Sequence, residues 1–496
     1  MKDTFYQLND ISNVFIKDGK ITSIEEDWLY RREGASCNGL ISLVVTVECS
    51  YEENSYVRHK IWLPNNWNGI FLGVGNGGSA GKFGNYIYEA TKGYAVAQTD
   101  MGTYKLMNEP MVLLPDATWT DYGKRATHKM VEVANTIILA RYGVKQKYSY
   151  FSGASAGGLQ AFSEFQNYPE DFDGIIARVP SNNALCFRMY RFWCFIKLRK
   201  EGYPLFTKQE KEDIYNLVLE FFSGYGKVKN GYLTHGWVGE DTVDKFIKFV
   251  EEKRPNFTKE QMEGLRALYE GPINPRTGKR IFCGMPFGAE INSGDLGDSN
   301  RLEQYGSPWF RVFFGEGYKD QDFDFDKYAD IFVRKHYLTN MANNPNIQKF
   351  KERGGKIICY SGGADPLGPW PDAMNYYNRV CNAFGGYDNV KDFFKYFVIP
   401  GRAHGESGYG LRVVTADENG GSQLDMLRAW RENGVEPEYL YGSHVENVLD
   451  SDGNVIDKKV LFGERIYAYK GDLVAGKDFQ ASTDEYYLNG AKEFLD

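Results

Sequence analysis

Residues 148–158, YSYFSGASAGG, constrain the fold of this chain more than any other segment. An aromatic stretch with strand-like alternation runs into GASAG (153–157), and an apolar pattern with helical spacing follows at once. This is a G-x-S-x-G motif in the strand–turn–helix context of a nucleophile elbow. The turn is sharp and strained, so its neighbours must lack bulk, which explains the glycines. The segment predicts that Ser155 stands above a sheet, where a base can reach it.

A second match to the motif, GGSAG (77–81), follows the apolar stretch IFLGVGN. No clean helical pattern comes after Ser79, so this loop does not fit an elbow. A glycine-rich loop after an early strand is typical of an oxyanion loop, whose backbone N–H groups bind a developing negative charge. We therefore interpret Gly77 and Gly78 as oxyanion donors together with Ala156, and Ser79 as a residue that lines the substrate pocket. A plain glycine-rich turn is the alternative.

The composition excludes several classes of function. The formal charge of -8 argues against nucleic-acid binding, which needs basic patches. No apolar run reaches the 18 or so residues of a membrane span, and the start, MKDTFYQLND, has no apolar signal segment. The seven cysteines are odd in number and form no C-x-x-C pair, which is typical of reduced, buried thiols. We expect a cytoplasmic protein without a cofactor, and the sequence leaves a homo-oligomer open.

Strand and helix patterns alternate along much of the chain, which favours an α/β fold with a mostly parallel sheet. The helical pattern over 125–143 ends at Gly143, a typical helix stop. The 496 residues are too many for one ordinary core. We expect an α/β-hydrolase catalytic domain from 1–181 and 346–496, with a β-rich extension over about 1–65. Residues 182–345 break the alternation and are helical and aromatic, so we interpret them as an inserted lid that binds substrate.

A nucleophilic serine needs a base, and the base needs an orienting carboxylate. In α/β hydrolases the chain order is Ser, then Asp or Glu, then His, on loops after later strands. KIICYSGGADP places Asp365 after one apolar strand, and FVIPGRAHG places His404 after the next. The sequence therefore predicts a triad of Ser155, Asp365 and His404. Asp365 as a turn residue before proline, or His404 as a surface histidine, are the alternatives.

These segments resemble the tannase and feruloyl esterase family, which also includes a mono-hydroxyethyl terephthalate hydrolase. The resemblance rests on motifs spread over about 70–470. It implies an α/β-hydrolase core with a large lid, hydrolysis of aromatic acid esters, and the same triad. The segments that carry it are GVGNGGSAG, DYGKRATHKM, FSGASAGGLQAFSEFQNYPEDFDGIIARVPS, NPRTGKRIFCGMPFGAE, SGGADPLGP and VIPGRAHG.

The chain departs from the family pattern in three places. Family members usually carry a cysteine before the serine and another after the histidine, joined by a disulfide, where this chain has Ala154 and Gly405. The family's calcium loop corresponds to SGYGKVKNGYL (223–233), which has no carboxylate, so we expect no metal there. The tail, FGERIYAYKG, lacks the usual cysteine. The losses fit a reduced compartment with little calcium.

The expected partner is a small aromatic ester, and the lid must select it. Aromatic and basic residues of the lid could contact the acyl group, although most would equally serve as lid core. The candidates are Arg188, Trp309 and Arg311. A serine peptidase or an acyltransferase on the same core is the alternative activity, and a non-catalytic binding protein would have lost part of the triad. A dinucleotide-binding role for the GVGNGG loop is a less favoured hypothesis, because no helix directly follows the loop.

Overall fold

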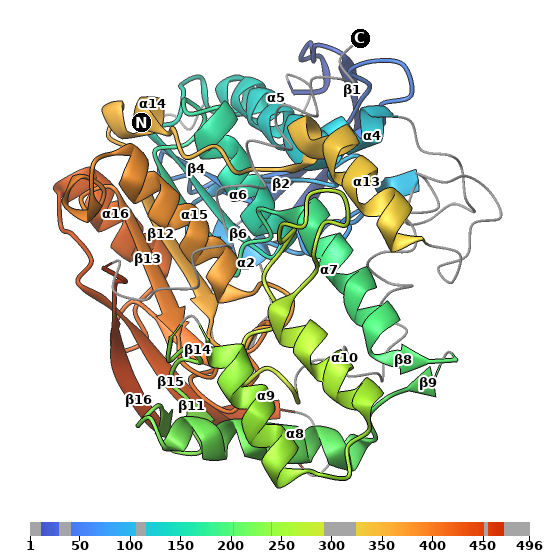
Figure 1. Cartoon of the computed structure of the whole chain (residues 1–496). Helices are drawn as coiled ribbons and strands as arrows, with labels where there is room; N and C mark the ends of the chain where they lie inside the picture. The colour runs from blue at the N-terminus through green and yellow to red at the C-terminus, as the bar shows by residue number, and fades with distance from the viewer. Residues whose placement is uncertain are drawn as a thin grey trace.

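A nine-stranded sheet forms the centre of the computed structural model, which describes residues 11–28, 41–105, 116–201, 203–239, 241–291, 324–450 and 455–470. The strand order is β1-β2-β3-β5-β4-β6-β7-β12-β13 (Figure 1). Strands from β5 to β13 pair in parallel, whereas β1, β2, β3 and β5 pair antiparallel. The mostly parallel sheet is the one that the sequence predicts, and the β-rich N-terminal residues form one edge of it.

Buried parallel strands read as near-continuous apolar runs, which is why these strands were visible in the sequence. Every residue of β4 and of β5 is buried. The strands of the sheet are β1 (Gly19–Trp28), β2 (Ile41–Cys49), β3 (Val57–Pro64), β4 (Ile70–Val74), β5 (Ala95–Thr99), β6 (Tyr148–Ala154), β7 (Gly174–Arg178), β12 (Lys356–Gly362) and β13 (Phe394–Ile399).

Helices cover both faces of the sheet, because successive strand residues point to opposite sides. Phe71 of β4 belongs to a core with α5 (Ala126–Tyr142), α6 (Ala156–Asn167) and α15 (Trp370–Ala383). Its neighbour Leu72 belongs to a separate core with α2 (Ile87–Thr91) and α16 (Gln423–Asn433). The shorter elements are α4 (Asp116–Thr120), the π-helix η1 (Asp121–Arg125), α14 (Gln348–Glu352), η4 (Tyr387–Asn389) and a second sheet of β14 (Val413–Thr415), β15 (Tyr439–Leu449) and β16 (Val455–Tyr467).

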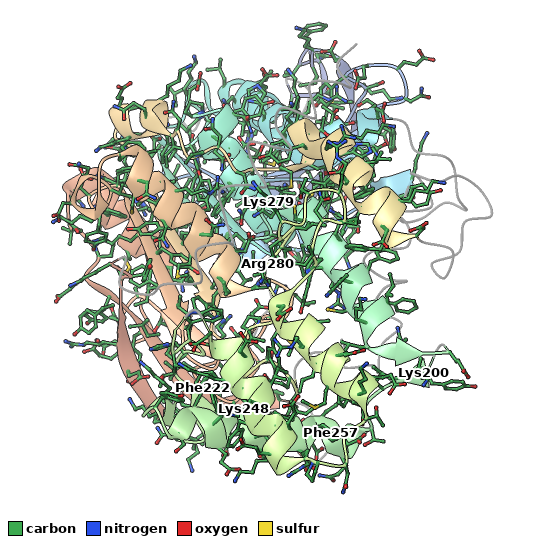
Figure 2. The ribbon with its side chains drawn as sticks, viewed as in Figure 1. Lys200, Phe222, Lys248, Phe257, Lys279 and Arg280 are labelled. Carbon is green, nitrogen blue, oxygen red and sulfur yellow. The ribbon has the colours of Figure 1, made fainter. Side chains whose placement is uncertain are left out.

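The described residues between β7 and β12 form a mainly helical segment, as the sequence indicates, with α8, α9 and α10 in the lower part of Figure 1 and α13 at its upper right. Figure 2 labels one residue from the interior of this segment and one from its surface. Phe222 of α8 is fully buried, whereas Lys248 of α9 is exposed. Whether this segment is a separate lid domain stays a prediction. Its elements are α7 (Ala184–Lys197), α8 (Lys208–Ser223), α9 (Thr242–Lys253), α10 (Lys259–Glu270), α13 (Phe325–Asn340) and two short hairpins, β8–β9 (Arg199–Lys200, Tyr203–Pro204) and β10–β11 (Val228–Lys229, Tyr232–Leu233).

Helix α13 of this insertion packs on the π-helix of the core at very short range. A Cβ atom on Gly123 would lie 1.6 Å from the carbonyl oxygen of Thr339, so only glycine allows the contact. Lys124 donates to the carbonyl of Leu338 at 3.1 Å, and Asn340 donates to the carbonyl of Trp119 at 2.8 Å. The insertion is therefore fixed to the core beside residues that approach the site described below.

A buried carboxyl group in the insertion makes stability depend on pH. Glu290 is fully buried, and its Oε1 accepts hydrogen bonds from the Tyr269 hydroxyl at 2.8 Å and the Gly288 N–H at 3.0 Å. Its Oε2 has no hydrogen-bond partner among the described residues. Burial raises the pKa of Glu290 from 4.5 to about 7. The native state therefore holds this proton between pH 4.5 and 7, where the unfolded chain has lost it.

Replacing Glu290 with Gln removes this titration. Because the native state binds the extra proton, wild-type stability falls as pH rises from about 4.5 to 7, by roughly 3 kcal/mol. We expect Glu290→Gln to melt several degrees higher than the wild type at pH 8.5 and close to it at pH 4.5, as measured by calorimetry. The exposed Glu438→Gln is the control for a lost charge. An equal shift at both pH values would contradict the assignment.

Candidate active site

Ser155 sits in the turn between β6 and α6 with a backbone that serine rarely adopts. Its φ is 61° and its ψ is -116°, outside the conformations open to most side chains. Backbone hydrogen bonds hold the turn, since the Ser155 N–H donates to the carbonyl of Arg178 at 3.0 Å and its own carbonyl accepts from Gly158 at 2.8 Å. Strain of this kind persists only where the surroundings fix it, and it is often found at functional sites.

Three glycines bring the backbones around this turn into contact. A Cβ on Gly153 would lie 2.2 Å from the carbonyl oxygen of Gly157, and a Cβ on Gly75 would lie 2.6 Å from the Cα of Gly157. The Gly157 N–H donates to the carbonyl of Asn76 at 2.6 Å. The backbones of the elbow and of the glycine-rich loop of 75–81 are thus packed directly against each other.

Asp365 and His404 meet at the carboxyl ends of β12 and β13. His404 Nδ1 lies 2.8 Å from Asp365 Oδ2. The other oxygen of this fully buried carboxylate accepts from the N–H groups of Leu367 at 2.8 Å and Gly368 at 3.0 Å. With Nδ1 carrying the proton toward Asp365, Nε2 of His404 is the basic nitrogen. This is the orientation that a general base requires.

One cavity of about 290 Å³ gathers most of the residues that the sequence singled out. They come from four separate segments of the chain, and Trp309 and Arg311 lie outside the described residues. The cavity lies where a reacting carbonyl group would meet serine, base and backbone donors together. Its lining includes Gly77, Gly78, Ser79, Ser155, Ala156 and His404.

Arg188 of α7 forms part of the far wall of this cavity, beside Phe187. The guanidinium lies 5.7 Å from the centre of the Tyr122 ring, and it donates to the carbonyl of Ala184 at 3.1 Å. Burial lowers the pKa of Arg188. The cavity therefore combines apolar and aromatic walls with two buried arginines, Arg188 and Arg191.

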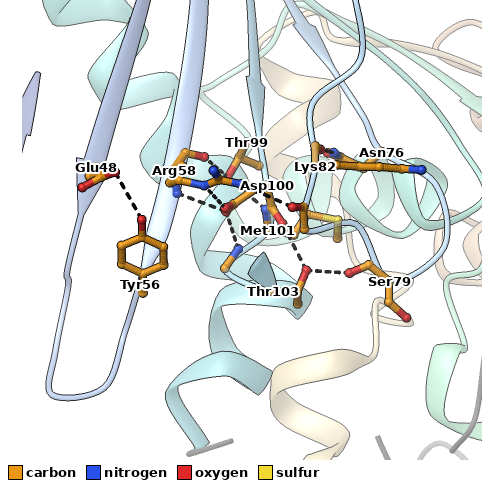
Figure 3. Close-up of polar contacts among 12 residues, drawn as sticks. Glu48, Tyr56, Arg58, Asn76, Ser79, Lys82, Thr99, Asp100, Met101 and Thr103 are labelled. Atoms are coloured by element: carbon orange, nitrogen blue, oxygen red, sulfur yellow. Dashed lines mark hydrogen bonds and ion pairs between the residues drawn. The ribbon is translucent and has the colours of Figure 1, made fainter. Parts of the chain in front are cut away.

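The glycine-rich loop is held by polar contacts that the sequence did not reveal. Figure 3 shows the hydroxyl of Thr103 donating to the carbonyl of Ser79, at 2.5 Å. The Tyr122 hydroxyl donates to the carbonyl of Gly78 at 2.9 Å, and Gln160 of α6 accepts from the Asn76 N–H at 2.8 Å. These bonds hold the carbonyls of Gly78 and Ser79 and the N–H group of Asn76, and Gly77 and Gly78 both line the cavity. Tyr122 lies in the DYGKRATHKM segment, but the sequence alone indicates no role for this tyrosine.

Behind the loop, a buried ion pair fixes the chain that carries Thr103. Arg58 Nε lies 2.8 Å from Asp100 Oδ2 (Figure 3), and the N–H groups of Arg58 and Gly102 donate to Asp100 Oδ1 at 3.0 and 2.9 Å. Burial raises the pKa of Asp100, while these three donors and the charge of Arg58 oppose the shift. The bonds fix the turn after β5, and so the position of the Thr103 hydroxyl.

The structure describes the residues at the disulfide and calcium-loop positions, while the expected lack of calcium stays a prediction. The six described cysteines are all free, and Ala154 and Gly405 both line a second cavity beside Ser155. In the loop over 223–233, the Lys227 Nζ lies 2.7 Å from His235 Nε2. The described residues contain no helix long and apolar enough to cross a membrane.

Comparisons with known proteins agree on the family. The model of the tannase and feruloyl esterase family matches residues 42–199 and 248–455. A protein of Aspergillus flavus named probable feruloyl esterase B-2 is 28% identical over 435 residues, which cover 82% of this chain and 80% of that protein. The feruloyl esterase B of Aspergillus niger is 24% identical over 479 residues, 90% of this chain and 88% of that one.

Solved structures show the same fold. The crystal structure of feruloyl esterase B from Aspergillus oryzae superposes with a TM-score of 0.74 at 19% identity, covering 95% of this chain and 98% of that chain. A tannin acyl hydrolase from Aspergillus niger gives a TM-score of 0.70 at 15% identity, covering 98% and 97%. These neighbours support the α/β-hydrolase fold expected from the sequence.

Removing the Thr103 hydroxyl tests the support of the glycine-rich loop. Thr103→Val keeps the shape of the side chain but releases the carbonyl of Ser79. We expect kcat for a p-nitrophenyl ester to fall about tenfold with a smaller change in KM, because misplaced donors weaken transition-state binding. Thr136→Val on the exposed face of α5 is the matched control. Unchanged kcat in a folded Thr103→Val protein would show that this hydroxyl does not position the loop.

Proposed function

Because this chain belongs to the tannase and feruloyl esterase family, we propose that it is a serine esterase that hydrolyses esters of phenolic acids through an acyl-enzyme. The family places it among carboxylic-ester hydrolases of phenolic acid esters. The serine mechanism rests on one observation above all. Ser155, in its strained turn, shares a cavity with a His404 that is oriented by the buried Asp365.

In the proposed mechanism, Nε2 of His404 takes the hydroxyl proton of Ser155 as the oxygen attacks the ester carbonyl. The resulting oxyanion is bound by the N–H groups of Ala156 and of the Gly77–Gly78 loop. The Ala156 N–H is suited to this, because the first amides of a helix have no partner within it. His404 then protonates the leaving alcohol, and water repeats the sequence on the acyl-enzyme. Asp365 stabilises the imidazolium without taking its proton.

The 290 Å³ cavity suits the aromatic acyl group of the substrate. Phe187 and Tyr122 provide apolar and aromatic surface for a ring, and Ala184 and Leu367 complete the apolar lining. Arg188 supplies a cation that can contact a phenolic oxygen or the face of an aromatic ring. Ser79 lines the same cavity and carries a hydroxyl group for a polar contact.

A serine peptidase or an acyltransferase would use the same three residues. The family membership favours ester hydrolysis, and a substrate panel separates the three activities. We expect methyl ferulate and methyl gallate to be cleaved, peptides to be left intact, and added alcohol to divert little of the acyl group.

Replacing each of the two G-x-S-x-G serines in turn tests which one is the nucleophile. Ser155→Ala should lower kcat for methyl ferulate by about 10⁶-fold, because the attacking oxygen is gone. Ser79→Ala removes at most one wall contact and should cost less than about tenfold. Steady-state kinetics measure both, and mass spectrometry after rapid quench should detect a feruloyl adduct on Ser155. Full activity in Ser155→Ala would refute the mechanism.

A further inference from the structure

A second, larger cleft of about 710 Å³ opens on the other side of Ser155. It shares Gly77, Ser155 and His404 with the smaller cavity, so both reach the same reacting atoms. One wall is the sheet face formed by β4 and β7, and the others come from α2 and the start of α16. Ala154 and Gly405 line it too, beside the serine and the histidine. The proposed mechanism uses only the smaller cavity and leaves this one without a role.

Two arginines beside the catalytic residues line this cleft. Arg178 ends β7 and pairs in register with Ala154 of β6, one residue before the serine. Arg402 lies in the turn after β13, two residues before His404, and only 7% of it is exposed. Burial lowers the pKa of Arg402 and the charge of Arg178 acts in the same direction, whereas Tyr360, Glu406 and Asp365 oppose the shift. Like charges have been brought together here rather than kept apart.

Neither guanidinium is satisfied within the part of the chain that the structure describes. Nε and Nη1 of Arg402 and Nε of Arg178 are buried without a hydrogen-bond partner there. A buried cation with unmet donors is costly unless an anion and acceptors offset it. Because the cleft is the free volume that both side chains line, an anion bound in it would supply what the protein does not.

The carboxylates of the cleft do not serve as that anion. Glu406 pairs with Lys458 at 2.5 Å, and Asp425 lies 3.9 Å from Arg428 and accepts from the Tyr94 hydroxyl at 3.5 Å. Glu89 belongs to α2, which also carries Lys92 into the cleft. Within the described residues, no carboxylate forms an ion pair with Arg178 or Arg402.

The start of α16 adds a further feature that favours an anion. Ser422, Gln423 and Leu424 line the cleft, and they are the cap and first residues of this helix of 11 residues. Backbone N–H groups at a helix start carry a partial positive charge. The two arginines and this helix end are groups that attract an anion, and Asp425 in the first turn of the helix lines the cleft as well.

We propose that Arg178 and Arg402 bind a carboxylate on the alcohol part of the ester, so that the preferred substrates are phenolic esters of a hydroxy acid. This inference rests on the proposed function, since it assigns the smaller cavity to the aromatic acyl group. The alcohol then occupies the remaining opening, where His404 protonates the leaving oxygen. Paired guanidinium groups suit a carboxylate because they offer charge-assisted, bidentate donors.

Chlorogenate and its methyl ester form a matched pair of substrates for this test. Both carry the same caffeoyl group on quinate, but only chlorogenate has a free carboxylate on the alcohol part. We expect the wild type to prefer chlorogenate in kcat/KM, and Arg402→Gln to reduce that preference at least tenfold, mainly through KM. Arg178→Gln is the second variant and should act in the same direction. Arg254→Gln, which removes a half-buried arginine that pairs with Asp213 outside the cleft lining, is the control for charge.

Thermal stability distinguishes a binding role from a structural one. Because Arg402 has unmet buried donors, Arg402→Gln should melt no lower than the wild type without ligand. Quinate should raise the melting temperature of the wild type and have less effect on Arg402→Gln. A lower melting temperature with an unchanged chlorogenate preference would show that Arg402 is structural and overturn the proposal.

Two further outcomes would also overturn it. Inorganic phosphate could raise the melting temperature of the wild type as much as quinate does, while chlorogenate and its methyl ester are cleaved equally well. This result would show that the subsite binds a free anion. If Arg402→Gln instead impairs only a mono-methyl ester of an aromatic diacid, the carboxylate belongs to the acyl part. Failure of the proposed function itself is seen separately, as activity that survives Ser155→Ala.

Discussion

The backbone of Ser155 is the constraint around which the other parts of the site are arranged. The strained φ of 61° is tolerated because the strand, the helix and the glycine-rich loop meet through glycine backbones. Any side chain at Gly153 or Gly157 would separate these segments, and the glycine-rich loop would move relative to Ser155. In the proposed mechanism, this contact therefore sets the nucleophile and the oxyanion donors relative to each other.

Support for this contact comes from outside the catalytic residues. Tyr122 bonds to the loop from the π-helix, and Gly123, next along the chain, is where α13 of the insertion packs on the core. The segment that builds the wall of the substrate cavity is thus anchored beside the residue that holds the oxyanion loop. A change in how α13 packs would reach the donors through Tyr122, which links substrate recognition to the geometry of the reaction.

Much of the sheet could be predicted from the sequence, because buried parallel strands leave continuous apolar runs. The strand expected before the serine turn is β6, and the helix expected over 125–143 ends at Gly143, whose φ is 71°. The same apolar runs predicted that Ser155, Asp365 and His404 each follow a strand of the sheet. Chain order, however, does not give distances, and the bond between Asp365 and His404 needed the structure.

The contacts that sequence reasoning missed depend on residues distant in the chain with no special local pattern. Thr103 and Tyr122 reach the loop from turns whose positions follow only from how the sheet and its helices pack. The sequence around Arg178 indicates only the end of a strand, and that around Arg402 only a loop. Neither local pattern shows that the two arginines line the same cleft. Trp309 and Arg311 lie outside the described residues, so their expected contacts stay predictions.

The pairing of Ala154 with Gly405 has a consequence for redox chemistry. Without cysteines at these positions, no oxidation step is needed to join the loop of the nucleophile to that of the base. Burial raises the pKa of Cys49 and Cys381 to about 11, and that of Cys359 well above its ordinary value, so the reactive thiolate is suppressed. The arrangement of the triad is thereby independent of the thiol–disulfide balance around the protein.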